Sequence, residues 1–323
     1  MKKIWLVVGI LLLLSGCAKE EAKNVGGNTG KYPVTWSENI DGNDYNEKVV
    51  KAPTKAISMS QATTEMMLAL GLEKNMVGTA FLEEEIYPSL KSAYDQVPVL
   101  SEKWPAYEVF MSSKPDFATG WPVPFTKRGI EASKIRGAGI PIYIPNSMQD
   151  PKGDLDTYFA DMIELGKIFG VDIKAEKYVE SEKKKLKEIM GKIAKNEPVK
   201  VFVFDSEDEQ PFTVFEGYTT NLLKMINLQN IMSGRGSEKT WGKTTWEELV
   251  NGNPDYIIIV DYGTSIRSTE DFDGKVKKLL ENPALQGVKA IQKKQFIRVK
   301  LSEITPGVRS VDALERISKQ IFK

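Results

Sequence analysis

The sequence predicts an α/β fold of two lobes, each with a central, mostly parallel sheet, joined by a long α-helix. Three observations predict it: strand and helix patterns alternate in both halves, a long amphipathic stretch separates the halves, and one short motif recurs in each. Alternation of strands and helices favours parallel sheets that helices cover. A chain of 323 residues is long enough for two such units.

The first half begins with a predicted hairpin over residues 32–51, where Asp41-Gly42 is typical of a tight turn. A helix is expected at 65–70, ending at Gly71, because glycine is common just after a helix. Short apolar runs predict buried strands at 56–59, 76–79, 117–120 and 140–144.

A helical stretch follows. Apolar residues at helical spacing, beginning at Leu155, predict one helix. Residues 172–196 form the expected connecting helix, which Asp172 is in a position to cap. Such a helix is a rigid spine, unlike a Gly/Ser linker. The alternative is that it is one more surface helix of a single domain.

The second half repeats the alternation. A helix is expected around residues 221–226. Strands are predicted at 199–204, 256–260 and 295–299. The lobes are therefore expected at 32–171 and 197–323.

Composition excludes several classes of function. The 44 basic and 44 acidic residues cancel, which argues against a dedicated nucleic-acid-binding protein. The chain has no histidine, so Ser-His-Asp triads and Cys/His zinc sites are excluded. Its single cysteine allows no internal disulfide.

The N-terminal segment predicts export. Two lysines precede an apolar run over residues 4–14, which is too short to span a bilayer and suits a signal peptide over 1–16. The run leads into LSGC, ending at Cys17, which resembles the lipobox of bacterial lipoproteins. This resemblance implies lipidation of Cys17 and a membrane anchor facing the extracytoplasmic side. The polar residues 17–31 read as a flexible tether.

A repeat links the two halves. Glu108 lies seven residues before Pro115-Asp116, and Glu247 lies seven residues before Pro254-Asp255. Each motif predicts a short helix, a turn and a buried strand. With the lipobox and the segments APTKAISM, SQATTEMMLALGL, NMVGTA and ITPGVRSVDALERI, the chain resembles substrate-binding lipoproteins of ABC importers for ferric siderophores, haem and cobalamin.

The resemblance covers residues 31–323, and it is closest to the iron-complex branch. It implies two Rossmann-like lobes joined by a long helix, with ligand bound between them and no catalysis. It also implies that Glu108 and Glu247 pair with arginines of a permease dimer, which is served by a cytoplasmic ATPase. Glu248 adjoins Glu247 and is the alternative docking residue. The protein is expected to act as a monomer.

Ligands of open α/β sheets bind beyond the carboxyl ends of the strands. This rule places a cleft at loops rich in aromatic residues, whose flat faces suit ring-bearing ligands. The predicted ligand residues are Ser60, Gln61, Phe81, Trp104, Trp121, Arg128, Asn146, Tyr218, Trp241, Tyr262 and Arg309.

Without histidine, a chelated metal is a better expectation than a bare ion. The expected ligand is therefore an iron(III)–siderophore chelate, with a corrinoid, haem or another ring-bearing cofactor precursor as the alternative. No intrinsic cofactor is expected. The competing class is an exported two-lobed enzyme or sugar-binding module, in which Glu83, Glu84 and Glu85 would supply glycosidase carboxylates.

Overall fold

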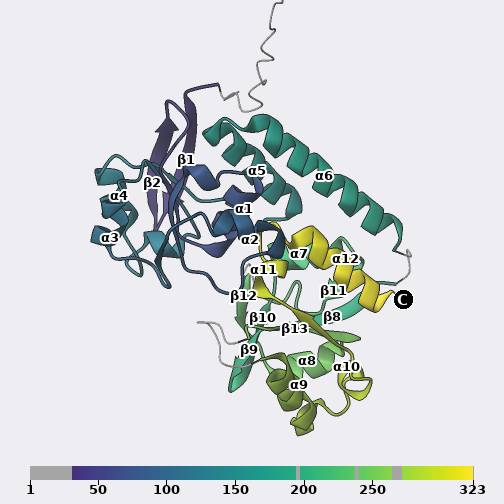
Figure 1. Cartoon of the computed structure of the whole chain (residues 1–323). Helices are drawn as coiled ribbons and strands as arrows, with labels where there is room; N and C mark the ends of the chain where they lie inside the picture. The colour runs from purple at the N-terminus through teal and green to yellow at the C-terminus, as the bar shows by residue number, and fades with distance from the viewer. Residues whose placement is uncertain (1–30, 194–196, 237–239, 264–270, 323) are drawn as a thin grey trace, which may run out of the picture.

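Two parallel sheets form the centres of two lobes in the computed structural model of the chain, which describes residues 31–193, 197–236, 240–263 and 271–322 (Figure 1). The predicted signal peptide, Cys17 and nearly all of the tether lie outside these residues. Within the described residues, no helix combines the length and apolar character needed to cross a bilayer. The predicted two-lobed α/β class is confirmed.

The N-lobe sheet has five parallel strands in the order β5-β4-β3-β6-β7. Its strands are β3 (Ala56–Ser58), β4 (Met76–Ala80), β5 (Val99–Ser101), β6 (Phe117–Thr119) and β7 (Ile142–Tyr143). The C-lobe sheet has four parallel strands in the order β11-β8-β13-β14. Its strands are β8 (Val199–Phe204), β11 (Leu228–Asn230), β13 (Tyr256–Val260) and β14 (Phe296–Val299).

The other strands form two small antiparallel sheets. The predicted hairpin is present as β1 (Val34–Ile40) and β2 (Asn43–Val49). The second sheet, in the order β12-β10-β9, was not predicted from the sequence. Its strands are β9 (Ser206–Asp208), β10 (Gln210–Val214) and β12 (Trp241–Lys243).

Along the chain, most helices connect one strand of a parallel sheet to the next. The helix expected at 65–70 begins earlier, at Gln61, because the Ser60 side chain accepts a hydrogen bond from the Thr63 amide and caps it. The α-helices are α1 (Gln61–Ala69), α2 (Lys91–Tyr94), α3 (Tyr107–Ser112), α4 (Ala132–Gly137), α5 (Leu155–Phe169), α6 (Asp172–Gly191), α7 (Tyr218–Lys224), α8 (Trp246–Gly252), α9 (Phe272–Glu281), α10 (Lys289–Gln292), α11 (Leu301–Ile304) and α12 (Ser310–Ile321). Short 3-10 turns occupy Glu73–Asn75, Pro88–Leu90, Val123–Phe125, Asn146–Met148 and Pro283–Leu285.

The repeated Pro-Asp motif has the same structural role in both lobes. The Asp116 carboxylate accepts hydrogen bonds from the amides of Thr54 and Lys55 at 2.9 and 2.8 Å. In the C-lobe, the Asp255 carboxylate accepts one from the Lys200 amide at 3.0 Å. Each aspartate therefore ties the turn before a central strand to the start of its neighbour, β6 to β3 and β13 to β8.

Helix α6 runs along both lobes and connects them (Figure 1). It is 20 residues long, or about 30 Å, and ends at Gly191 rather than near residue 196. Asp172 is its first helical residue, and Val171 is its cap. Gly166 lets α5 approach α6 closely, because a side-chain carbon there would lie 2.5 Å from the Ala175 methyl group.

The two lobes share one continuous apolar core. Buried side chains of β6 and α5 in the first lobe and of β8, α7 and α12 in the second lobe pack in the same cluster. Tyr158 on α5 and Leu314 on α12 are among them, and each is at most 1% exposed. This shared core packs the two lobes directly against each other.

The β1–β2 hairpin docks against β7 through two buried carboxylates. Glu38 accepts a hydrogen bond from the Ile144 amide at 2.8 Å, and Glu47 lies 2.8 Å from Arg136. Burial is the largest effect on both groups and raises the pKa of each to about 7. The folded protein therefore binds protons at these two sites more tightly than the unfolded chain.

A carboxyl group with a raised pKa stabilises the fold below its unfolded pKa, and this contribution is lost as pH rises through about 7. We expect the melting temperature to fall between pH 5.5 and pH 8, and to fall less in Glu38→Gln. Thermal unfolding at both pH values measures this, with the exposed Glu102→Gln as the control. An unchanged pH dependence in Glu38→Gln would contradict the assignment.

Candidate ligand-binding cleft

A cavity of about 630 Å³ lies between the lobes, within the usual range for small-molecule sites. We call it the ligand cavity. Both lobes contribute to its wall, and aromatic side chains predominate. The lining residues are Phe81, Lys103, Trp104, Trp121, Val123, Arg128, Asp205, Phe212, Trp241, Tyr262, Leu301 and Thr305.

Most of this wall follows from the topology of the two parallel sheets. Phe81 directly follows β4, Asp205 directly follows β8, and Leu301 comes two residues after β14. Trp121 and Tyr262 each come two residues after a central strand, β6 or β13. The carboxyl ends of both sheets therefore face the ligand cavity, as expected for open α/β sheets.

Two aromatic pairs, one from each lobe, dominate the wall. In the N-lobe, Phe81 stacks on Trp104 with ring centroids 4.7 Å apart. In the C-lobe, Phe212 stacks on Trp241 with centroids 6.4 Å apart. The Trp104 indole N–H donates to the Met59 carbonyl at 3.1 Å, which fixes the ring. Flat, held rings on both sides of a cavity favour a ligand that presents broad apolar or conjugated faces.

One carboxylate lies deep in this aromatic wall. Asp205 is 7% exposed, and its carboxylate accepts hydrogen bonds from the Tyr262 hydroxyl at 2.6 Å and the Ser206 hydroxyl at 2.9 Å. Lys275 is buried behind Tyr262, with its ammonium 5.0 Å from the ring centre and 2.6 Å from the Val260 carbonyl. These contacts hold Tyr262 and Asp205 in place before a ligand arrives.

The lining cations are exposed and belong to the N-lobe. Lys103 follows β5, and Arg128 follows the Trp121 loop. Solvent screens charges at such positions more than it screens Asp205. The ligand cavity therefore combines a screened basic rim with a buried acceptor, which suits a ligand of mixed polarity.

Six of the eleven predicted ligand residues line this cavity: Phe81, Trp104, Trp121, Arg128, Trp241 and Tyr262. The other five do not: Ser60, Gln61, Asn146, Tyr218 and Arg309.

Three of these five have local structural reasons for their position. Ser60 is fully buried as the cap of α1. Tyr218 begins α7, and its hydroxyl donates to the Ser310 hydroxyl at 2.8 Å, which keeps the side chain inside the protein. Asn146 is exposed after β7, the edge strand of the N-lobe sheet.

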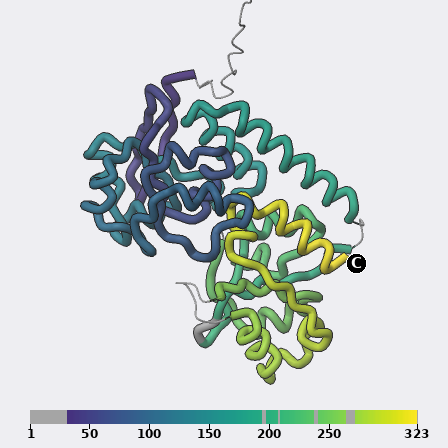
Figure 2. The backbone as a smooth tube through the Cα atoms, viewed as in Figure 1, coloured from purple at the N-terminus to yellow at the C-terminus, as the bar shows by residue number. Residues whose placement is uncertain are grey.

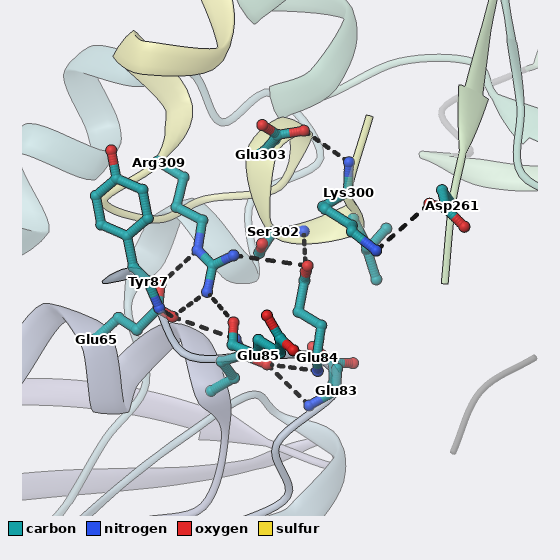
Figure 3. Close-up of polar contacts among 12 residues, drawn as sticks. Glu65, Glu83, Glu84, Glu85, Tyr87, Asp261, Lys300, Ser302, Glu303 and Arg309 are labelled. Carbon is teal, nitrogen blue, oxygen red and sulfur yellow. Dashed lines mark hydrogen bonds and ion pairs between the residues drawn. The ribbon is translucent and has the colours of Figure 1, made fainter. Parts of the chain in front are cut away.

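Gln61 and Arg309 hold a loop that borders the ligand cavity. The Gln61 side chain accepts hydrogen bonds from two loop amides. The Arg309 guanidinium is buried in an ion pair with Glu65 (Figure 3). The two residues lie at the boundary between the lobes. The sequence predicts only that both residues lie in loops near the cleft, and it does not reveal their hydrogen-bond or ion-pair partners.

Sequence reasoning missed six lining residues: Lys103, Val123, Asp205, Phe212, Leu301 and Thr305. Asp205 directly follows β8 and Leu301 comes two residues after β14, and both strands are predicted from the sequence. The rule that ligands bind beyond the carboxyl ends of the strands was therefore sufficient to find both residues. Phe212 lies on β10, in the antiparallel sheet that was not predicted, and no sequence signal marked it.

The repeated glutamates occupy matching positions on the surface. Glu108 is the second residue of α3, and Glu247 is the second residue of α8. Both side chains are exposed. The neighbouring Glu248 is only partly exposed and pairs with Arg235.

Two α/β lobes, a long connecting helix and an aromatic cavity between the lobes define a bilobal solute-binding protein. The sequence profile of the family described as "Periplasmic binding protein" matches residues 57–301, and the chain belongs to this family. Members of this family bind solutes and are not enzymes.

Similar proteins agree with this placement. A crystal structure of a periplasmic binding protein from Veillonella parvula DSM 2008 is 58% identical, with a TM-score of 0.87, covering 90% of this chain and 98% of that one. The uncharacterized ABC transporter substrate-binding lipoprotein YvrC of Bacillus subtilis (strain 168) is 26% identical over 269 residues, 81% of each chain.

More distant structures share the fold. An ABC-type Fe³⁺-hydroxamate transport protein from Saccharomonospora viridis DSM 43017 is 17% identical, with a TM-score of 0.70, covering 89% of this chain and 99% of that one. The periplasmic haem-binding protein HutB of Vibrio cholerae is 19% identical, with a TM-score of 0.67, covering 84% of this chain and 100% of that one.

Proposed function

We propose that the chain is the substrate-binding lipoprotein of an ABC importer of the siderophore, haem and cobalamin type. It binds an iron(III)–siderophore chelate in the ligand cavity and delivers it to the permease. The observation that carries this proposal is the pair of aromatic walls, one from each lobe, around a single buried carboxylate.

The choice of ligand rests on chemistry. The absence of histidine removes the usual ligand for bare Zn²⁺ and the commonest axial ligand of haem, so a metal that arrives already chelated fits better. The names of the Saccharomonospora and Vibrio proteins support iron chelates and haem as ligand classes. A corrinoid or haem is the second candidate, because the paired rings also suit a macrocycle.

Titration of intrinsic tryptophan fluorescence separates these ligands, because three tryptophans line the ligand cavity. We expect saturable one-to-one quenching by a ferric siderophore such as ferrichrome or ferric enterobactin, and weaker quenching by haem or cyanocobalamin. Preference for haem or cyanocobalamin would replace the siderophore assignment. No binding in the whole panel would contradict it.

Delivery requires docking on a permease dimer. Glu108 and Glu247 are exposed at the same position of two equivalent helices, so they present two matching charges to a twofold partner. Val109 and Val250 are 41% and 37% exposed on the same helices and supply apolar contacts beside the charges. The pairing of Glu248 with Arg235 favours Glu247 as the docking residue.

The predicted lipid anchor keeps the protein beside this permease on the extracytoplasmic face. Cys17 receives the lipid, and the residues up to 31 form the tether. Palmitate labelling that persists after Cys17→Ala would contradict the anchor.

The rival enzyme hypothesis depended on the carboxylates of residues 83–85. Glu84 accepts a hydrogen bond from the Ser302 amide at 3.2 Å and lies 3.6 Å from the Arg309 guanidinium. These contacts use the carboxylate to join the lobes, and the three glutamates border a neighbouring cavity of about 620 Å³ instead of the ligand cavity. The geometry therefore favours a binding protein.

A further inference from the structure

A short loop connects the ligand cavity to the contact between the lobes. We call residues 81–87, which directly follow β4, the strap. Its first residue, Phe81, forms part of the cavity wall, and its last residue, Tyr87, lies beside Arg309 (Figure 3). Phe81 has a φ of +60°, a left-handed conformation that is costly for an aromatic residue. Such a conformation persists only where neighbouring contacts enforce it.

Side chains of α1 hold the strap from the N-lobe. The Gln61 side-chain carbonyl accepts the amides of Glu83 and Glu84 at 2.8 and 3.0 Å. One turn further along α1, the Glu65 carboxylate accepts the Tyr87 amide at 2.9 Å. Three strap amides therefore depend on two buried side chains, which are 1% and 2% exposed.

Arg309 holds the same strap from the C-lobe. Its guanidinium binds the Glu65 carboxylate in a two-point ion pair, with Nε 2.9 Å from Oε2. It also donates to the Glu85 carbonyl at 2.7 Å and lies 5.3 Å from the centre of the Tyr87 ring. The side chains of Arg309 and Glu65 are 8% and 2% exposed. The strap is thus clamped between α1 and the start of α12.

A second contact from the same loop reaches α11. The Glu84 carboxylate accepts the Ser302 amide, and Ser302 directly follows Leu301 of the cavity wall. Figure 2 shows the C-terminal segment, in yellow, crossing next to the blue N-lobe chain where these contacts occur. We call the contacts of Arg309 and Ser302 with the strap the clamp. The clamp therefore lies next to wall residues of both lobes, Phe81 and Leu301.

We propose that Arg309 is a positioning residue for ligand binding: by clamping the strap onto α1, it holds Phe81 against Trp104 and keeps that part of the cavity wall formed before the ligand arrives. It acts through the strap and does not line the ligand cavity. The shared apolar core packs the two lobes together, whereas the clamp positions the part of the cavity wall that Phe81 forms.

Hydrogen exchange of the ligand-free chain tests the clamp, because three strap amides are protected by the clamped side chains. In Arg309→Met we expect exchange of peptides covering residues 81–87 to rise about tenfold, while peptides from β8 keep their rates. A second variant, Arg309→Met with Glu65→Gln, removes both charges, avoids a buried unpaired carboxylate and keeps a side-chain oxygen for the Tyr87 amide. We expect the same local increase in it.

Ligand affinity tests whether loss of the clamp weakens binding. If the formed wall falls to about one-tenth of the population, the Kd for ferrichrome rises about tenfold. This arm rests on the proposed function, and the exchange arm does not. If ferrichrome fails to bind the unaltered chain, the siderophore assignment fails, the exchange result still decides the clamp, and haem or cyanocobalamin replaces ferrichrome as the probe.

Arg316→Met is the matched control. Arg316 also lies on α12, but it pairs with Glu303 inside the C-lobe. We expect no change in strap exchange or in Kd for this variant. Unchanged strap exchange in both Arg309 variants would overturn the proposal, as would equal acceleration in the strap and β8, or a loosened strap with unchanged Kd.

Discussion

Replacing Trp104 and Trp241 together with alanine is expected to weaken ligand binding severely. Each tryptophan belongs to one of the two stacked pairs, so the double variant opens both walls of the ligand cavity. Buried aromatic anchors in binding sites typically contribute about 2 kcal/mol or more each. Loss of two corresponds to a Kd increase on the order of 10³-fold. Isothermal titration with the best ligand from the fluorescence panel measures it.

A tryptophan away from the ligand cavity provides the control for this result. Trp36 lies on β1, where its indole N–H donates to the Ile142 carbonyl at 2.9 Å, and it does not line the ligand cavity. We expect Trp36→Ala to lower the melting temperature and leave the Kd unchanged. Binding that survives in a folded Trp104→Ala, Trp241→Ala variant would exclude the ligand cavity as the site.

Reversing the charge of both docking glutamates, Glu108→Lys with Glu247→Lys, is expected to reduce transport at least tenfold. In the proposed docking, lysines at these positions face permease arginines, and the repulsion of like charges suppresses encounter and docking. Both side chains are exposed, so stability should change by less than about 0.5 kcal/mol. Uptake of radiolabelled iron–siderophore by cells, together with ligand affinity of the purified chain, separates docking from binding.

Two other exposed glutamates match this change in charge. Glu176 lies on α6 and Glu281 on α9, so Glu176→Lys with Glu281→Lys alters the net charge equally at other places. We expect normal uptake in this control. If the docking variant transports normally, or if the control loses as much uptake, Glu108 and Glu247 do not form the permease contact.

The sequence was informative wherever local patterns determine structure. Buried strands appear as apolar runs, and parallel strands bring their carboxyl ends to one edge, so Phe81, Trp121 and Tyr262 could be placed in the wall from the sequence. The repeat predicted equivalent helices, and Glu108 and Glu247 do occupy the same position in α3 and α8.

The contacts of residues with distant partners could not be predicted from the sequence. Arg309 lies in a loop beside the cleft, which suggested ligand contact, but its partner Glu65 is 244 positions away. A charge buried away from water is strongly destabilising unless an opposite charge pairs with it, and no local sequence pattern reveals which distant residue does so. Phe212 was missed for a related reason, since the antiparallel pairing of β10 with β12 brings it to the cavity.

A crystal structure of the chain with its bound ligand would show where the ligand lies. We predict one ligand between the lobes, in contact with Phe81 or Trp104 on one side and with Phe212 or Trp241 on the other. Arg309 should keep its ion pair with Glu65 and make no contact with the ligand. A ligand bound outside the aromatic walls would exclude the ligand cavity as the site, and a ligand held by Arg309 released from Glu65 would contradict its positioning role.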